Sequence, residues 1–149
     1  MPATAKQQFG CDPRSLGEVS ACESVRHVLV VDDDLCIRKG LRIRLEGAGY
    51  KVSTAENGTE GILFFDEKGA DLIILDVKMP DIDGFEVCKS VKEKQDDVPV
   101  IFLTGAQNRI IRDYLPQMVE AVGGDFFMRK PFDARLLMKL ISEILNGKR

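Results

Sequence analysis

Three carboxylates, one hydroxyl and one ammonium group directly follow short hydrophobic runs in this sequence. Asp32 and Asp33 follow the first run, Asp76 the third, Thr104 the fourth and Lys130 the fifth. Singly, each has an ordinary explanation as a helix cap, a turn residue or a solvated charge. Clustered carboxylates, however, resist ionising together unless a cation neutralises them. Magnesium is the natural candidate, because it prefers hard oxygen ligands and binds through one or two carboxylates plus phosphate oxygens.

The hydrophobic runs alternate with amphipathic stretches, and this alternation predicts how the five side chains are positioned. The predicted strands are residues 27–31, 50–55, 72–75, 98–103 and 125–128. The predicted helices are one between Asp34 and Gly47, then 57–68, 84–94 and about 107–122, and one capped by Asp133. In the helix over 57–68, Ile62, Leu63 and Phe65 are expected to face inward. Strands that alternate with helices indicate an α/β fold with a parallel sheet covered on both faces. Right-handed crossovers favour an open, doubly wound sheet, and such sheets bind ligands outside the carboxyl ends of their strands.

Composition narrows the class of protein. The 149 residues suit one domain, and 21 basic against 24 acidic residues give a net charge of −3, too mild for a nucleic-acid surface or a membrane anchor. The four cysteines form no CxxC pair and His27 is the only histidine, so neither zinc nor a disulfide framework is indicated. Residues 1–26 read as a flexible extension without a secretory signal, and residues 27–146 as the folded domain. We expect a cytoplasmic protein.

Four motifs resemble those of receiver domains in two-component signalling. They are Val30-Val31-Asp32-Asp33, Leu75-Asp76-Val77-Lys78-Met79-Pro80-Asp81-Ile82-Asp83-Gly84, Leu103-Thr104-Gly105 and Lys130-Pro131-Phe132. The resemblance runs from about residue 27 to residue 146. It implies a flavodoxin-like, five-stranded sheet in the order 2-1-3-4-5.

The resemblance also implies roles in the cleft. Asp76 would accept a phosphoryl group, and Asp32, Asp33 and Asp76 would bind Mg²⁺ together with the backbone carbonyl of Lys78. A carboxylate is a competent phosphoryl acceptor once its charge is shielded, and the transfer needs mainly positioning and charge neutralisation. No catalytic histidine is then required, and His27, expected at the opposite end of the sheet, is interpreted as a surface residue.

Two further residues would complete the switch. Thr104 and Lys130 would contact the phosphoryl oxygens, and Phe127 on the fifth strand would follow Thr104 inward on activation. For Phe127, a purely structural role in the core is the alternative.

The resemblance predicts a phospho-acceptor switch rather than an enzyme, one that assists its own phosphoryl transfer and dephosphorylation. Its partners would be a sensor histidine kinase or phosphotransfer protein and a downstream protein target, with neither nucleic acid nor membrane bound directly. A dimer through the fourth helix, fifth strand and fifth helix is one arrangement that the resemblance allows. Few residues follow the last helix, so the chain would be either a stand-alone receiver or a fragment of a longer protein.

Three other functions fit this sequence less well. The sequence Asp81-Ile82-Asp83-Gly84 superficially matches the DxDG signature of haloacid-dehalogenase-type phosphatases, but that motif should directly follow a strand, and here Asp76 does. A scaffold that has lost phosphorylation is disfavoured because every pocket position carries the expected residue type. A flavodoxin-type or nucleotide-binding protein would need a glycine-rich loop after the first strand, where acidic residues stand instead.

The segment between Thr104 and Lys130 is a few positions longer than receivers usually show. Pro116 falls within the expected fourth helix, where an interior proline costs about 3 kcal/mol or more. Because proline is tolerated in a first helical turn, the sequence predicts a loop over 107–114, a helix that begins near Leu115 and an end at Gly123 and Gly124. The alternative is a continuous, kinked helix. A late start would give the domain an unusual output surface.

Overall fold

A computed structural model describes residues 25–105 and 109–147 as one parallel sheet flanked by helices. The elements in chain order are β1 (His27–Val31), α2 (Leu35–Gly47), β2 (Lys51–Ala55), α3 (Gly58–Lys68), β3 (Leu72–Asp76), α4 (Gly84–Lys94), β4 (Val100–Thr104), α5 (Arg109–Ala121), β5 (Phe126–Arg129) and α6 (Ala134–Gly147). All strand pairs are parallel and the order is β2-β1-β3-β4-β5. The predicted fold class and strand order are confirmed. The predicted extension over 1–26 lies almost entirely outside the described residues.

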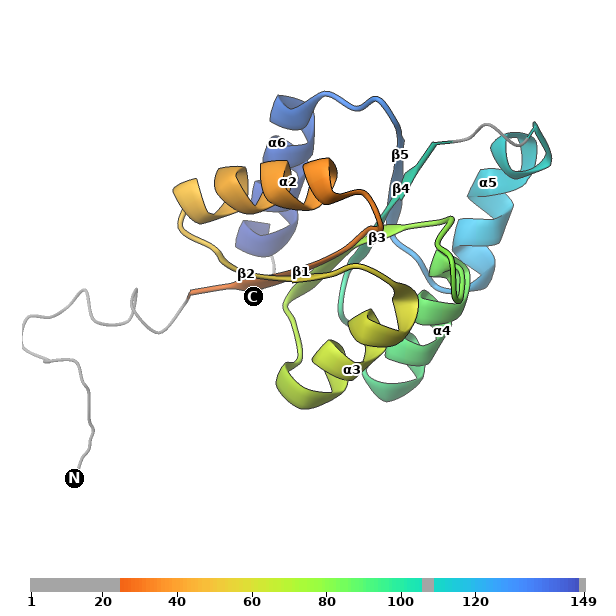
Figure 1. Ribbon diagram of the computed structural model, residues 1–149, viewed down its shortest axis with the longest axis horizontal. Helices are drawn as coiled ribbons and strands as arrows, with labels where there is room; N and C mark the ends of the chain where they lie inside the picture. The colour runs from red at the N-terminus through yellow and green to blue at the C-terminus, as the bar shows by residue number, and fades with distance from the viewer. Residues whose placement is uncertain (1–24, 106–108, 148–149) are drawn as a thin grey trace, which may run out of the picture.

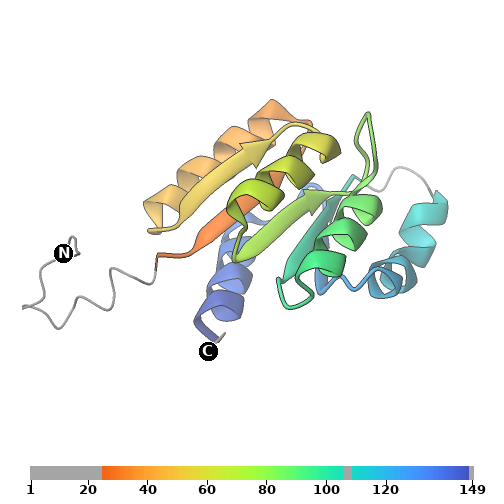
Figure 2. The same ribbon diagram turned by 90° about the horizontal axis from the view of Figure 1, so that it is seen from below.

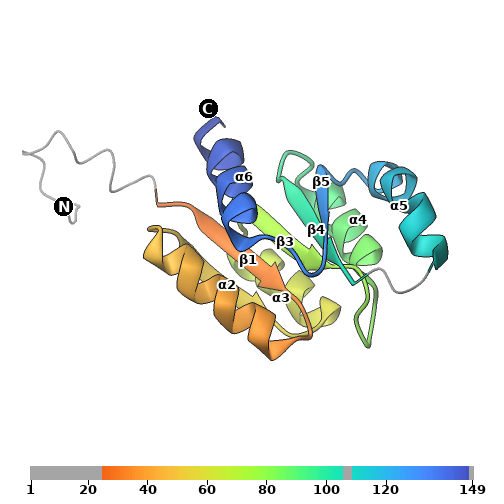
Figure 3. The ribbon, with the colours of Figure 1, turned by 90° about the horizontal axis from the view of Figure 1, so that it is seen from above.

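The sheet lies between two layers of helices (Figure 1). Helices α2 and α6 cover one face, which Figure 3 presents to the viewer, and α3, α4 and α5 cover the opposite face, seen in Figure 2. Strand β3 is buried throughout and serves both faces, because successive side chains of a strand point to opposite sides. Leu72 and Ile74 pack toward α2 and α6, whereas Ile73 and Leu75 pack toward the other layer. No helix among the described residues is long and apolar enough to cross a membrane.

Capping residues fix where the helices begin. The Asp34 side chain accepts hydrogen bonds from the amides of Cys36 and Ile37, and Asp133 caps α6 in the same way, as predicted. Asn57, predicted as the first residue of α3, is instead its N-cap. The strand ends differ from the predicted ones by one or two residues, as is usual for boundaries read from sequence.

Leu63 was predicted to face inward in α3, and this is wrong. Its side chain is 56% exposed, while Phe65 is buried and Ile62 and Phe64 pack against the core. Four consecutive apolar residues span more than one turn of a helix, so they cannot all point at the sheet. A run of four apolar residues in a helix therefore does not mean that all four are buried.

Helix α5 begins earlier than the sequence predicts. It runs continuously from Arg109 to Ala121 with Pro116 inside it, so the predicted start near Leu115 is wrong. Leu115 is fully buried and Val119 nearly so, and this packing outweighs the local cost of the proline. Because α5 does not start late, the structure gives no unusual output surface of the kind that the sequence predicts.

Pro116 should cost α5 stability, because it lacks an amide donor and is exposed in the middle of the helix. We expect Pro116→Ala to raise the free energy of unfolding by about 1–2 kcal/mol, the gain being reduced by the greater freedom of alanine in the unfolded chain. Urea denaturation measures the change. The neighbouring exposed substitution Gln117→Ala serves as the control and should change the midpoint little. A lower midpoint for Pro116→Ala would show that the proline fits this helix without cost.

Candidate functional site

The carboxyl edge of the sheet gathers the side chains singled out in the sequence. Because every strand runs in the same direction, the ends of β1, β3, β4 and β5 lie along one edge. Asp32 and Asp33 follow β1, Asp76 ends β3, Thr104 ends β4 and Lys130 follows β5. The structure therefore places all five on the same side of the domain.

Asp32, Asp33 and Asp76 form a tight acidic cluster. One carboxylate oxygen from each lies within 4.8 Å of the others. Asp32 and Asp76 are buried, with 1% and 4% of their surface exposed, while Asp33 is open to solvent. The Nζ atom of Lys130 lies 3.0 Å from Oδ2 of Asp32 and 3.4 Å from Oδ1 of Asp76, so one ammonium group faces two buried carboxylates. The cluster carries more negative charge than Lys130 neutralises.

Asp32 is held by groups on both sides. Its Oδ1 accepts a hydrogen bond of 2.9 Å from the amide of Asp34, and its backbone carbonyl accepts one of 2.7 Å from Nη1 of Arg38. The sequence patterns did not predict the Arg38 contact. The signal for it is the position of Arg38 one turn into α2, shortly after the acidic pair. Among the described residues, Oδ2 of Asp32 is buried without a well-aligned hydrogen bond, and the ammonium group of Lys130 lies 3.0 Å from it. An oxygen in this situation is suited to a cation.

This environment changes the proton affinity of both partners. Burial and, next, the charge of Asp32 raise the pKa of Asp76, Lys130 opposes the rise, and the net result is a pKa of about 7. Burial lowers the pKa of Lys130, but its contacts with Asp32 and Asp76 outweigh burial, so the pKa ends above the usual value. Lys130 is therefore a permanent cation beside a carboxylate that is costly to ionise.

A sharp turn after β3 shapes the outer wall of the site. The amide of Gly84 donates to the carbonyl of Val77 at 2.7 Å, and a Cβ atom on Gly84 would lie only 2.2 Å from the backbone oxygen of Asp76. Only glycine fits there. The loop borders an open pocket of about 430 Å³. The residues that line the pocket are Asp33, Asp76, Lys78, Met79, Pro80, Gly105 and Lys130.

Thr104 and Phe127 do not line this pocket. Thr104 is buried, and its carbonyl accepts a hydrogen bond of 2.7 Å from the amide of Lys130, which joins the ends of β4 and β5. Phe127 pairs in register with Phe102 and is half-buried against the layer of α3, α4 and α5. Both lie near the site, and their part in a switch stays a prediction.

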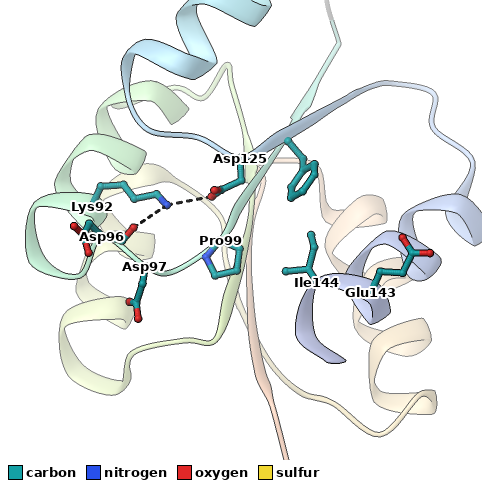
Figure 4. Close-up of a pocket in the computed structure, with 8 residues that line it drawn as sticks. Lys92, Asp96, Asp97, Pro99, Asp125, Glu143 and Ile144 are labelled. Carbon is teal, nitrogen blue, oxygen red and sulfur yellow. Dashed lines mark hydrogen bonds and ion pairs between the residues drawn. The ribbon is translucent and has the colours of Figure 1, made fainter. Parts of the chain in front are cut away.

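The opposite edge of the sheet has polar groups of a different kind. His27 is half-buried at the start of β1 and shares a 2.7 Å hydrogen bond with Ser53. A second pocket, of about 450 Å³, lies between the end of α4, the starts of β4 and β5, and α6 (Figure 4). Lys92 there binds Asp125 at 3.1 Å and the carbonyl of Val98 at 2.7 Å. These contacts tie elements together, and none of the predicted site residues lies in this pocket.

Residues 28–142 match the family model of the response regulator receiver domain. The chain belongs to this family. A protein named "Probable transcriptional regulator ycf27" from Cyanidium caldarium is 43% identical over 121 residues, which cover 80% of this chain and 46% of that protein. The receiver domain therefore spans about half the length of the curated relatives it matches.

Solved structures agree with this assignment. The chemotaxis protein CheY4 of Vibrio cholerae is 33% identical, with a TM-score of 0.73 over 80% of this chain and 98% of that one. The response regulator TrrA of Thermotoga maritima, solved in complex with Mg²⁺-BeF, is also 33% identical, with a TM-score of 0.70 over 80% of this chain and 99% of that one.

The raised pKa of Asp76 predicts how stability depends on pH in the metal-free protein. Between the ordinary value of 3.8 and about 7, folded Asp76 holds a proton that the unfolded chain has lost. Its contribution therefore destabilises the fold increasingly as the pH rises through this window, and the penalty is complete above it. We expect Asp76→Asn to raise the free energy of unfolding by about 1–3 kcal/mol more near pH 8.5 than near pH 5.

Urea denaturation at the two pH values measures this difference. The control is Asp96→Asn, which alters an exposed carboxylate at the opposite edge of the sheet and should show no such pH dependence. An equal effect of Asp76→Asn at both pH values would mean that Asp76 ionises without penalty.

Proposed function

We propose that this receiver domain accepts a phosphoryl group on Asp76 from a sensor histidine kinase or a phosphotransfer protein. The observation that carries the proposal is the convergence of three carboxylates and Lys130 at one edge of the sheet, with Asp76 at the floor of the open pocket. The phosphatase alternative has little support, since Asp83 caps α4 and Asp81 binds the start of α3.

Magnesium is the metal that this donor set fits best. Its proposed ligands are Asp32, Asp33 and Asp76, with the backbone carbonyl of Lys78 as a further oxygen. Hard carboxylate oxygens within 4.8 Å of one another and the buried, poorly bonded Oδ2 of Asp32 support this assignment. The metal would neutralise the acidic cluster and shield the negative charge of the incoming phosphoryl group. The relative TrrA was solved with Mg²⁺-BeF.

In the transfer step, a carboxylate oxygen of Asp76 forms a bond to phosphorus. The bond from phosphorus to the donor breaks, and the donor group leaves with the electron pair. Lys130 would offset charge on the transferred oxygens, and the Thr104 hydroxyl would donate a hydrogen bond to one of them. Asp76 is deprotonated when it attacks, so no general base is needed. The same groups would assist hydrolysis of the phosphorylated form, as in a switch rather than an enzyme with an external substrate.

The output is proposed to be a change in protein contacts made by a cytoplasmic domain over residues 27–146. Thr104 would move toward the phosphoryl group and Phe127 would follow it inward. This would alter the surface of α5, β5 and α6 for a downstream protein or for dimerisation. Direct contact with nucleic acid or membrane is not part of the proposal for this chain.

The acceptor assignment predicts the behaviour of one substitution. Incubation with Mg²⁺ and acetyl phosphate should give a base-labile phosphate adduct, which intact-mass spectrometry or radiolabel detects. Asp76→Asn removes the nucleophile and should abolish the adduct, whereas Asp96→Asn should retain it. An undiminished adduct on the Asp76→Asn protein would assign the acceptor elsewhere.

The switch predicts a structural difference between two states. Structures with and without beryllofluoride and Mg²⁺ should show the Thr104 hydroxyl closer to the ligand and Phe127 in a more buried rotamer when the ligand is bound. The control is Phe102, which is already fully buried and should keep its rotamer. An identical Phe127 rotamer in the two structures would leave it a purely structural residue.

A further inference from the structure

The loop from Val77 to Asp83 is attached to a helix on the far side of the pocket wall. Both carboxylate oxygens of Asp81 are used: Oδ1 accepts from the amide of Gly58 at 3.0 Å, and Oδ2 accepts from the amide of Thr59 at 2.8 Å. These amides are the first two of α3 and point out of the helix without partners of their own. The loop and the helix, 22 and 23 positions apart in the sequence at these contacts, are thereby joined.

A second contact holds the loop against α3. A Cβ atom on Gly58 would lie 2.5 Å from Cγ1 of Ile82 and 3.0 Å from its carbonyl oxygen. Glycine at this position therefore lets the loop backbone approach the helix end more closely than any other residue would. The hydrogen bonds of Asp81 and the close approach of Ile82 to Gly58 therefore hold the loop against the same end of α3.

Helix α3 already has a cap of its own. The side chain of Asn57 accepts a hydrogen bond of 2.8 Å from the amide of Glu60, and the Glu60 side chain accepts one of 2.7 Å from the amide of Glu56. Asp81 therefore adds an attachment from outside the helix. Hydrogen bonds from the side chain and amide of Thr59 and from the amide of Gly58 hold the pKa of Asp81 far below its usual range, so the attachment persists throughout neutral pH.

The loop between these anchors borders the pocket. Lys78, Met79 and Pro80 line it beside Asp76, and the loop is fixed at its other end by the bond from Gly84 to Val77. In the described part of the chain, the hydrogen bonds that join residues 78–82 to another element all end on the carboxylate of Asp81. The polar attachment of the pocket wall to α3 therefore rests on this one side chain, beside the apolar packing of Met79 and Ile82.

The geometry points to Asp81 as a positioning residue for the metal site. Its two hydrogen bonds attach the loop that contains Lys78 to the start of α3. This inference rests on the proposed function, because it assumes that Mg²⁺ binds beside Asp76 with the carbonyl of Lys78 as a ligand. It goes beyond that proposal by giving a role to Asp81 and Gly58, two residues that do not line the pocket.

Asp81→Ala would test this attachment of the loop to α3, with Asn57→Ala as the matched control. Both substitutions remove a cap from the same end of α3, and each should lower the melting temperature, but only Asp81→Ala releases the loop. Mg²⁺ titrations followed by the rise in melting temperature should give a half-saturating concentration about fivefold higher for Asp81→Ala and little changed for Asn57→Ala. Asp33→Ala, which removes a proposed ligand, provides the reference for direct damage to the site.

Two further measurements separate positioning from general destabilisation. Asp81→Asn keeps an acceptor oxygen and should restore part of the Mg²⁺ affinity. Gly58→Ala leaves Asp81 in place but displaces Ile82, and should weaken Mg²⁺ binding although alanine favours a helix. Without metal, amide exchange over residues 77–83 should be faster in Asp81→Ala than in Asn57→Ala.

The outcomes distinguish the inference from the function on which it rests. If the unaltered chain neither binds Mg²⁺ nor forms the Asp76 adduct, the proposed function fails. If it does both, and Asp81→Ala and Asn57→Ala bind Mg²⁺ equally well, Asp81 is only a helix cap and the positioning role is overturned.

Discussion

Crowding of negative charge at the end of a buried sheet is the constraint on which this domain depends. Asp32 and Asp76 are almost fully removed from solvent, and one ammonium group, that of Lys130, faces both. Ionised carboxylates in such a place are costly unless a cation or a proton compensates them. The raised pKa of Asp76 expresses this cost. Ionisation of the whole cluster therefore destabilises the fold, and a bound cation would offset this cost.

The fold supplies the rigidity that this arrangement needs. The two carboxylates extend from central strands that are buried on both faces, so neither can move away without disturbing the core. Lys130 is fixed by the bond from its amide to the carbonyl of Thr104 across β4 and β5. Compensating charge must therefore come to the carboxylates, because the carboxylates cannot leave the edge of the sheet.

The loop that lines the outer side of the pocket is held differently from the strands that carry the carboxylates. Residues 77–83 belong to a loop whose first amide, that of Val77, still bonds to Leu103 of β4. Beyond Val77 the loop is held by contacts with α3 and α4. At the opposite edge, Lys92 joins Asp125 and the carbonyl of Val98 and so links α4 to the starts of β4 and β5.

The sequence by itself determined the elements, the sheet and the edge at which the chemistry gathers, because hydrophobic periodicity is a local property and helices between successive strands imply parallel pairing. It also identified the residues after each strand. Only the tertiary structure decided which of several adjacent apolar residues is buried, as at Leu63, and whether packing of Leu115 outweighs the helix-breaking tendency of Pro116. The contact of Asp81 with Gly58 and Thr59 likewise joins segments far apart in the chain. No local pattern encodes it, since its energy arises from a loop and the start of a helix that meet only in the folded state.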